Sequence, residues 1–470
     1  MPLRRTVIRG ADLTAHLLAL RAELQLPATF PAEVVAEAES AANAGGLSAH
    51  EDATDVELVT LDPPGSRDLD QAFALSRRAG GGFHFAYAIA DVAAFVRPGG
   101  AVDAEAHSRG ETIYLPDGRV ALHPPVLSEG AASLLPGADR PAVLWRLDLD
   151  AEGEPTSVDV RRCVVRSRAQ LDYPSFERTG GDLVALLREV GELRQQREGD
   201  RGGVSLPVPE QEVVRDGDRW LLDLRAPLPS EGWNAQLSLL TGMTAAKLML
   251  DGGVGLLRTL PPPPTWLIAS LRRSALALGV DWPADAKYAD VVRGLDATVP
   301  AQAALLRLAS VLFRGASYVA FDGAPPAQTI QSAVAAPYAH ATAPLRRLAD
   351  RYVSECCLAA CAGRDVPEWV HAALPALAEE MAVADRRAHA ADRAVVDLAE
   401  ALVLSTRVGE VFRGVVVEAG RKGKPGGEVQ LRDPAVRGRL EGDHLPLGQE
   451  VDVRLSEADV AHRRVVFTLV

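Results

Sequence analysis

The sequence predicts an α+β protein with a small helical element at its N-terminus, a central mixed α/β domain and a five-stranded OB barrel at its C-terminus. Three changes of pattern along the 470 residues lead to this prediction. Leucines at helical spacing occur in residues 1–50, strand-like segments fill 51–165, and helical spacing returns from 230 to about 404. Short strands separated by glycine and polar turns follow. We therefore expect three units, residues 1–50, 51–404 and 405–470.

Two helices are expected in the first unit. Residues 11–24 carry leucines close to helical spacing, and Pro31 opens a second helix over 32–42 that ends before Gly45-Gly46. This pattern does not fit an OB barrel. It fits a small helical or helix-turn-helix element, or two helices that pack on the main domain.

Strands are expected in the first part of the central unit. Apolar residues alternate in FHFAYAIADV, residues 83–92, as in a half-buried strand, and two further strands are expected over 143–149 and 158–165. The intervening segment ETIYLPDGRVALHPPVLSE, residues 111–129, is Pro-rich and is expected to be irregular, with Tyr114 near its start.

Helices are expected in the second part of the central unit. Helical spacing begins with Ser230 as a plausible N-cap and stops at Gly252-Gly253. Four prolines at 261–264 mark a connection, and the last helix is expected over about 376–404.

One of these helices carries an arginine pair. In YAHATAPLRRLADRYVSECCLAA, residues 338–360, Thr342 can cap a helix and Pro344 suits its first turn. Arg346 and Arg347 would then lie in the first turn, where free backbone N–H groups favour anions, and would form a phosphate site. The alternative is that the arginines pair with Asp350 and other nearby carboxylates.

Three aspartates gather in the segment LVTLDPPGSRDLDQA, residues 58–72. A strand ends at Pro63-Pro64, because proline has no N–H for a sheet ladder. The loop that follows can bring Asp62, Asp68 and Asp70 together, and crowded carboxylates favour a hard divalent cation. Such a cation can hold a phosphate oxygen and activate a water. The alternative is an ordinary Asp-rich turn, and the spacing is not that of an EF-hand.

The C-terminal unit has a local basic excess. Residues 421–439 contain six Lys or Arg against Glu428 and Asp433, although the whole chain has a net charge of −13. The overall charge argues against non-specific nucleic-acid binding, so a nucleic-acid site must be local. An OB barrel with a basic edge favours single-stranded nucleic acid, and the alternative is a solvated loop.

Cysteine usage and hydropathy point to a cytoplasmic protein. The four cysteines form no CxxC pair, and buried free thiols in a reducing compartment are the simplest interpretation of Cys163, Cys356, Cys357 and Cys361. We find no apolar signal core at the N-terminus and no apolar run of about 18 residues, so we expect no membrane segment.

Six segments, in this order, resemble the ribonuclease II family of processive 3′→5′ exoribonucleases. They are LVTLDPPGSRDLDQA, FHFAYAIADVAAFVRPG, TIYLPDGRVALHPPVLSE, SLLPGADRPA, RGGVSLPVPE and YAHATAPLRRLADRYV. The resemblance covers about residues 30–470, including the C-terminal barrel. It implies a monomer that hydrolyses single-stranded RNA to nucleoside 5′-monophosphates by water attack, with Mg²⁺, or Mn²⁺, as the cofactor.

The resemblance also implies roles for individual residues. Asp62, Asp68 and Asp70 match three of the four acidic positions that bind the metal, and Asp70 matches the one held most critical. Arg346 matches the arginine that steadies the scissile phosphate, and Arg347 would help to hold the RNA backbone.

Further residues are implied to contact RNA. Tyr114 matches the tyrosine that stacks on the terminal nucleotides and sets the length of the final product. Asp392 aligns approximately with a glutamate near the 3′ base. His340 is also expected to be an RNA-binding residue, and it should order the loop before the arginine pair.

The sequence departs from the family pattern at three important places. Gln71 stands at the fourth acidic position, where an amide oxygen can ligate a metal but brings no charge. Leu206 replaces the aromatic residue that clamps the RNA from the other side, so the grip on the last nucleotides should be looser. The paired N-terminal OB barrels of the bacterial enzymes are missing. A catalytically weak or inactive RNA-binding protein therefore remains an alternative, as does a hydrolase of small phosphate esters.

Overall fold

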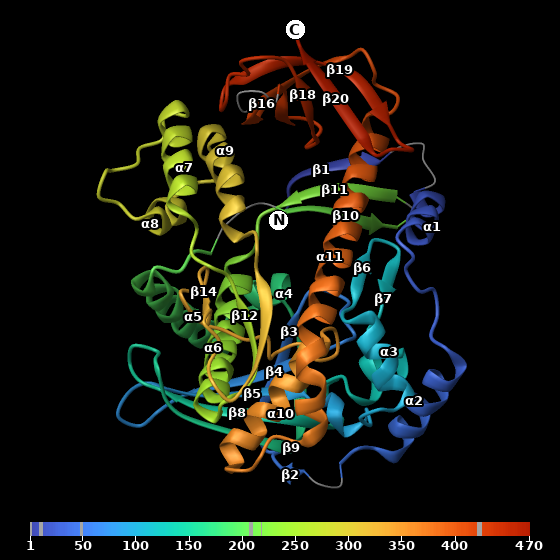
Figure 1. Cartoon of the computed structure of the whole chain (residues 1–470), viewed down its shortest axis with the longest axis vertical. Coiled ribbons are helices and arrows are strands. Elements are labelled where there is room, and N and C mark those ends of the chain that lie inside the picture. Colours follow the sequence, from blue (N-terminus) through green and yellow to red (C-terminus); the bar gives the residue numbers. More distant parts are fainter. Residues whose placement is uncertain (1, 9–12, 48–49, 206–209, 218, 421–424) are drawn as a thin grey trace.

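The computed structural model describes residues 2–8, 13–47, 50–205, 210–217, 219–420 and 425–470. Its centre is a six-stranded sheet with the strand order β2-β9-β3-β4-β5-β8 (Figure 1). The long strand β9 pairs in antiparallel fashion with β8 through its first part and in parallel with β3 through its last part. The six strands are β2 (Glu51–Asp52), β3 (Leu58–Asp62), β4 (Gln71–Arg77), β5 (Phe83–Ala90), β8 (Asp139–Leu149) and β9 (Pro155–Asp172).

Helices cover both faces of this sheet, as the alternation along its strands requires. Phe73, Tyr87 and Trp145 point to one face, where they join a core with the helices α5, α6, α10 and α11. Ala72 and Ala88 point to the other face, toward α2 and α3. The helices are α2 (Ala32–Ala44), α3 (Ala101–Arg109), α5 (Asp182–Arg201), α6 (Pro229–Gly252), α10 (Leu348–Ala362) and α11 (Glu368–Leu404).

Two of the predicted helix limits need correction. Helix α6 begins at Pro229 rather than after Ser230, because proline suits the first helical turn, and it ends before Gly253, which has φ 78° as a left-handed cap. Helix α11 begins at Glu368, eight residues before the predicted start, and continues through Pro375.

The N-terminal segment contains a strand that the sequence did not predict. The two expected helices are present as α1 (Leu13–Glu23) and α2, but β1 (Pro2–Ile8) precedes them. It pairs with β11 (Arg219–Arg225), which in turn pairs with β10 (Glu210–Asp216). The first residues of the chain therefore form part of a three-stranded sheet with a segment about 215 residues away. The division of the chain at residues 50 and 404 stays a prediction.

The C-terminal region forms the predicted barrel. Five strands close in the order β16-β17-β18-β20-β19, at the end of the molecule opposite β2 and β9 (Figure 1). Their bounds are β16 (Val411–Ala419), β17 (Gly427–Leu431), β18 (Arg437–Glu441), β19 (Glu450–Asp459) and β20 (Arg464–Leu469). The upper end of α11 packs against this barrel and joins its core to that of the N-terminal strand.

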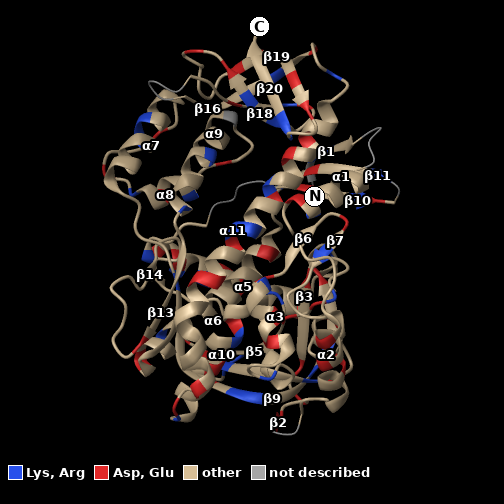
Figure 2. Cartoon of the chain, turned by 45° about the vertical axis from the view of Figure 1, so that its right-hand side comes forward, with Lys and Arg blue, Asp and Glu red and all other residues tan. Residues whose placement is uncertain are grey.

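A small group of helices packs on the other side of the barrel. Apolar residues of α7 and α9 share a core with Val415 and Val417 of β16. Acidic and basic residues are interspersed along the described ribbon rather than separated into halves (Figure 2). None of the described helices is long and apolar enough to cross a membrane. The helices are α7 (Thr265–Ala277), α8 (Tyr288–Arg293) and α9 (Pro300–Ala309).

The remaining elements are short and connect these units. They are the strands β6 (Ile113–Leu115), β7 (Gly118–Val120), β12 (Val254–Thr259), β13 (Ser317–Asp322), β14 (Ile330–Gln331) and β15 (Ala336–Pro337), with the helix α4 (Tyr173–Thr179) and the helical turns η1 (Val92–Ala94), η2 (Leu127–Ala131) and η3 (Ser310–Phe313). The four cysteines are free, and three of them are buried, as predicted.

Candidate active site

The aspartate loop, residues 63–70, connects β3 to β4 and is held in place by hydrogen bonds to Ser133 and to Ala90. The backbone N–H of Leu69 donates to the Ser133 hydroxyl at 3.0 Å, and that hydroxyl donates to the carbonyl of Arg67 at 2.6 Å. The carbonyl of Asp70 accepts from the N–H of Ala90 at 2.8 Å. These bonds fix the backbone of the loop, so the directions of its carboxylates follow from the fold.

Asp70 lies at the centre of the site and is 2% exposed. Its Oδ1 accepts from the backbone N–H of Leu345 at 2.7 Å, and its Oδ2 accepts from Nε of Arg346 at 2.9 Å. Burial raises the pKa of Asp70 to about 7, against the opposing effect of the Arg346 charge and the Leu345 N–H. A carboxylate in this position gains from any further positive charge that binds beside it.

Asp62 ends β3 and has an oxygen without a partner. Its Oδ2 is buried and accepts no hydrogen bond from a described residue. Burial raises the pKa of Asp62 to about 6, which Arg346 opposes and Asp68 increases. A buried carboxylate oxygen with no donor is unusual and is explained when a ligand supplies the missing partner.

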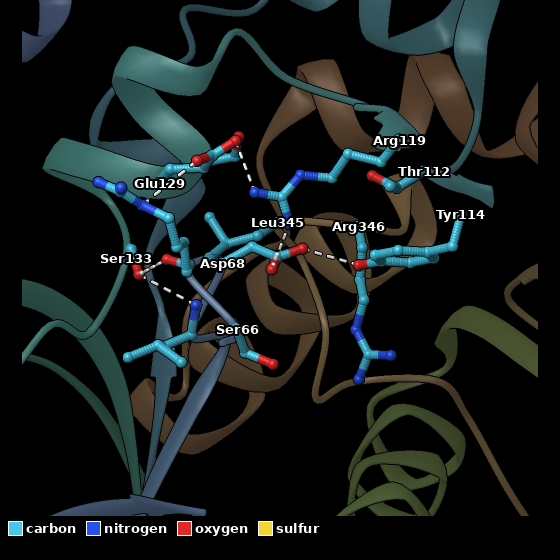
Figure 3. Close-up of polar contacts among 12 residues, drawn as sticks. Ser66, Asp68, Thr112, Tyr114, Arg119, Glu129, Ser133, Leu345 and Arg346 are labelled. Atoms are coloured by element: carbon cyan, nitrogen blue, oxygen red, sulfur yellow. Dashed lines mark hydrogen bonds and ion pairs between the residues drawn. The ribbon is translucent and has the colours of Figure 1, made fainter. Parts of the chain in front are cut away.

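Asp68 has both carboxylate oxygens engaged (Figure 3). Tyr114 donates its hydroxyl to Oδ2 at 2.7 Å, and Nη1 of Arg119 lies 2.6 Å from Oδ1. The second terminal nitrogen of Arg119 lies 2.5 Å from Oε1 of Glu129. Asp68 therefore connects the aspartate loop to the β6–β7 hairpin.

The hairpin itself corrects the sequence interpretation. Residues 111–129 were expected to be irregular, but Ile113–Leu115 and Gly118–Val120 pair as β6 and β7, with Tyr114 opposite Arg119. Gly118 has φ 143° at the turn, a conformation that favours glycine. The sequence Pro-Asp-Gly at the start of β7 is a turn signal that could have predicted this hairpin. Tyr114 and Arg119 pair across the turn, so the hairpin would have placed their side chains on the same face.

Gln71 begins β4 and points to the other face of the sheet from Asp70. Its Oε1 accepts a hydrogen bond from the hydroxyl of Tyr87 at 2.5 Å and another from the hydroxyl of Ser238 at 3.3 Å. Neither Tyr87 nor Ser238 was identified from the sequence. They come from β5 and α6, and only the packing of that helix on the sheet brings them together.

The carboxylates fit a divalent cation only in part. Among the residues that the structure describes, no three of His, Cys, Asp and Glu lie close enough together to hold a metal ion. The unpartnered oxygen of Asp62 and the burial of Asp70 fit a hard cation with oxygen ligands, and Mg²⁺ characteristically uses one or two carboxylates and keeps several waters. Asp62 and Asp70 are thus the two aspartates best suited to such an ion.

The arginine pair does not lie in the first turn of a helix, as predicted. Helix α10 begins at Leu348, because the N–H of Leu345 is used by Asp70 and that of Leu348 by the carbonyl of Gly110. Arg346 and Arg347 instead belong to the turn before the helix, so the expected N-terminal anion site is not built from them.

The two arginines have different partners. Arg346 uses Nε for Asp70, its side chain is 42% exposed, and its terminal nitrogens have no hydrogen-bond partner among the described residues. Arg347 forms two hydrogen bonds to Asp350, at 3.1 and 2.9 Å. The alternative interpretation, pairing with Asp350, is thus confirmed for Arg347, whereas Arg346 can still reach a phosphate.

The other predicted RNA contacts lie in different settings. Tyr114 is 50% exposed and its ring lies beside Arg346 (Figure 3). His340 is partly buried and its Nδ1 lies 2.6 Å from the Tyr318 hydroxyl. Burial lowers the pKa of His340 well below its ordinary value, and nearby arginines add to the decrease, so its imidazole is neutral. Asp392 is exposed on α11, and Leu206 lies outside the described residues.

A second concave region lies between the barrel and the α7–α9 helices. It is a cavity of about 1100 Å³, lined by six arginines and by four carboxylates. Arg314 and Arg439 have no ion-pair partner among the described residues, so positive charge remains available. The arginines are Arg307, Arg314, Arg437, Arg439, Arg463 and Arg464, and the carboxylates are Asp397, Glu400, Glu418 and Glu428.

The half-buried Asp62, the buried Asp70 and Arg346 with its open terminal nitrogens form a candidate site for a phosphate group and a divalent cation. Comparison with known proteins shows the family to which the chain belongs. Residues 50–361 match the RNB domain, and residues 410–470 match the RNase II-type exonuclease C-terminal S1 domain. The chain belongs to the RNB-domain family.

Individual relatives are more distant. Ribonuclease R of Escherichia coli is 26% identical over 89% of this chain, and the chain spans 57% of that relative's length. Mycoplasma genitalium RNase R, solved in complex with ribose methylated single-stranded RNA, is 20% identical, with a TM-score of 0.83 over 98% of this chain and 78% of that one. Yeast Ssd1, described as a pseudonuclease, is 17% identical, with a TM-score of 0.71 over 95% of this chain and 57% of that one.

Proposed function

We propose that this protein is a processive 3′→5′ exoribonuclease that hydrolyses single-stranded RNA to nucleoside 5′-monophosphates. The observation that carries the proposal is the pairing of Asp70 with Arg346, which leaves the terminal nitrogens of the guanidinium free beside a buried carboxylate. Arginine recognises a phosphate through two parallel N–H donors, and Arg346 has these donors available. The relative from M. genitalium is solved with single-stranded RNA, which supports the choice of substrate.

Asp62 and Asp70 would hold the divalent cation, Mg²⁺ or Mn²⁺. When bound, the cation polarises the scissile phosphate and lowers the pKa of a water. Arg346 holds a phosphate oxygen through its terminal nitrogens, and the half-exposed ring of Tyr114 stacks on a base close to the 3′ end. Asp68 keeps Tyr114 in place through the hydroxyl contact.

Upstream RNA would occupy the arginine-lined cavity between the barrel and the α7–α9 helices. OB barrels bind single strands with a positively charged groove, and this cavity is lined by β17, β18 and the start of β20. Because carboxylates lie among the arginines, this cavity should bind RNA phosphates weakly enough for the strand to slide. We propose that the protein works as a monomer in the cytoplasm, and light scattering on purified protein tests the first point.

A time course with 5′-labelled oligo(A) on a denaturing gel tests the proposal, in Mg²⁺, in Mn²⁺ and in EDTA. A ladder that shortens from the 3′ end to a short limit product in the metals, and no change in EDTA, is the expected result. Cleavage within the chain, or degradation that persists in EDTA, would contradict the proposal.

One observation favours the alternative of a catalytically weak or inactive RNA-binding protein. Gln71 brings no charge, and both oxygens of Asp68 are engaged, so fewer carboxylates than expected face a cation. RNA that stays intact in both metals, although it is bound in a filter assay, would establish this alternative. Failure to bind oligo(A) at all would point instead to a small phosphate ester as the substrate.

A further inference from the structure

We propose that the ring of Trp266 stacks on a base of the RNA strand that occupies the arginine-lined cavity. The ring would hold that base at the edge of the cavity, and Arg273 on the same helix would contact a phosphate of the same strand. The inference rests on the proposed function for the identity of the ligand. Trp266 lies in none of the six segments that resemble the ribonuclease II family.

Trp266 is unusual because its side chain faces solvent. It is 60% exposed, whereas the other five tryptophans of the chain are buried or half-buried. Among the Phe, Tyr and Trp residues that the structure describes, Tyr114 of the candidate active site is the only other exposed one. An exposed ring leaves a large apolar area in water, so a ligand that covers the ring gains from its burial.

Trp266 lies at the edge of the arginine-lined cavity. Leu267, Ser270 and Ser274 of α7 line this cavity. Since successive residues of a helix are turned by about 100°, Trp266 lies within about 40° of Ser270 around the helix axis. Leu276, the other large apolar side chain of α7 that is exposed, lies about 180° from Leu267 and faces away from the cavity. The flank of α7 that carries Trp266 is therefore the one beside the cavity.

The backbone of Trp266 is fixed by its surroundings. Four prolines precede α7, and the carbonyl of Pro264 accepts a hydrogen bond from the N–H of Leu267 at 2.9 Å. Leu267, Leu271 and Ala275 are buried in a core with α9 and β16, next to the barrel (Figure 1). A ring carried by a fixed helix needs little ordering when a ligand binds, and this favours affinity.

An unpaired cation lies on the same flank of α7. Arg273 follows Trp266 by seven residues, which places it about 20° away around the axis and about 10 Å along it. Arg273 is exposed and forms no ion pair with a described residue, whereas its neighbour Arg272 is held by two backbone carbonyls. Arg314 and Arg439, also without ion-pair partners in the described part of the chain, line the cavity itself.

Single-stranded RNA fits this arrangement better than an apolar protein segment does. Trp266 and Leu276 lie on different faces of α7, so they form no continuous apolar patch of the kind that protein partners cover. A base has a flat face that can cover a single ring, and its phosphates match free guanidinium groups. Proteins that bind single strands combine these same two features, stacking rings and a positively charged groove.

RNA binding by the whole protein in EDTA tests the role of the ring. Anisotropy of 5′-labelled oligo(A) of about 20 nucleotides should show at least about fivefold weaker binding to Trp266→Ala than to the natural chain, as expected for the loss of one stacked base. Trp266→Phe keeps a ring and should give an intermediate affinity. Unchanged affinity in Trp266→Ala would overturn the proposal.

Removal of bases from the strand separates stacking from other effects. We would use a strand of the same length in which only about four nucleotides at the 3′ end keep their bases, so that all phosphates remain. Trp266→Ala should bind this strand within about twofold of the natural chain, because no base is left to stack at the cavity. Arg273→Met should weaken the binding of both strands to a similar degree, since it removes a phosphate contact. If Trp266→Ala loses as much affinity for the abasic strand as for oligo(A), stacking is refuted.

Leu276→Ala is the matched control. It removes an equally accessible apolar side chain from the opposite face of α7, so both RNA affinities should stay within about twofold of those of the natural chain. A loss as large as that of Trp266→Ala would show a general disturbance of α7 and would overturn the proposal. Unchanged RNA affinity in Trp266→Ala together with a loss of dimers in light scattering would overturn it too, and would assign the ring to a second copy of this chain.

These measurements are independent of turnover. If the variants bind RNA as described but the natural chain leaves oligo(A) intact in both metals, the exoribonuclease proposal fails while the assignment of Trp266 stands. If the natural chain degrades oligo(A) and Trp266→Ala binds it with unchanged affinity, the reverse holds.

Discussion

Arg119 is expected to influence the length of the limit product indirectly, because it holds Asp68, which in turn holds the ring of Tyr114. Its terminal nitrogens lie 2.6 Å from Asp68 and 2.5 Å from Glu129, and it stands opposite Tyr114 in the β6–β7 pair. Tyr114 in turn donates its hydroxyl to Asp68 at 2.7 Å. Replacing Arg119 by methionine keeps an unbranched apolar stem but removes the guanidinium, whose charge holds Asp68 and the hairpin together.

The size of the effect follows from the exposure of the pair. The side chain of Arg119 is 21% exposed and that of Asp68 is 10% exposed. Loss of one partner of a fully buried pair costs about 3–5 kcal/mol, and an exposed pair contributes about 0–1 kcal/mol. We therefore expect Arg119→Met to lower the free energy of unfolding by about 1–2 kcal/mol. Stacking on an aromatic side chain is worth about 1–3 kcal/mol per base, and displacement of Tyr114 would forfeit part of that amount.

The assay is the length of the limit product on 5′-labelled oligo(A), measured with the rate of shortening of long substrates. Arg119→Met should stop at a longer product and should keep its rate on long RNA, since Arg346 and Asp70 are untouched. Arg119→Lys retains a cation beside Asp68 but loses the double contact, so it should give an intermediate length. If Tyr114→Ala lengthens the product while Arg119→Met leaves it unchanged, the connection through Asp68 has no role in holding the ring.

Three further outcomes are expected. Asp70→Asn should abolish turnover in the oligo(A) assay and retain RNA binding in EDTA, and an equal loss of both would remove Asp70 from the chemical step. Because burial holds the pKa of Asp62 at about 6 and that of Asp70 at about 7, above their ordinary values, the folded chain binds more protons than the unfolded chain between about pH 4 and 7. The stabilisation by these protons is lost as the pH rises through that window, so Mg²⁺ should raise the Tm more at pH 8 than at pH 5.5, and an equal rise would refute this. Arg347→Met leaves the fully buried carboxylate of Asp350 without its cation and should cost about 3–5 kcal/mol in urea unfolding, and a loss below 1 kcal/mol would show that backbone donors alone satisfy Asp350.

Much of the fold could be predicted because its elements have strong local patterns. The strand β5, parts of β8 and β9, the helix α6 and four of the barrel strands follow from periodicity and turn residues, whereas β18 was not predicted as a separate strand. β1 could not be predicted, because its partner β11 lies more than 200 residues away and PLRRTVI has no regular alternation. The start of α10 was misplaced because Asp70, remote in sequence, takes the N–H of Leu345.

The site was predicted as a set of residues but not as a set of contacts. Spacing predicted that the loop gathers Asp62, Asp68 and Asp70, but Asp62 ends β3 and no three carboxylates form a metal-binding cluster among the described residues. Spacing could not show that Asp68 is neutralised by Arg119, because that contact depends on how the hairpin folds over the loop. Hydroxyls that face a site from another element, such as Ser238 on α6, leave no signal in the sequence near the motif.

The three aspartates are close in sequence, but their different surroundings imply different roles. Asp68 has two close donors, so its charge is compensated before any ligand arrives. Asp70 shares its charge with Arg346, the arginine proposed to bind the phosphate, and Asp62 has an oxygen with no partner among the described residues. A cation gains most where charge is least compensated, so it should approach Asp62 first and draw Asp70 into its shell. A cation bound beside Asp70 would weaken the ion pair between Asp70 and Arg346. The guanidinium of Arg346 would then be more available to bind the phosphate. We therefore expect cation and RNA to bind cooperatively at the proposed site, with Asp70 as the group that couples them.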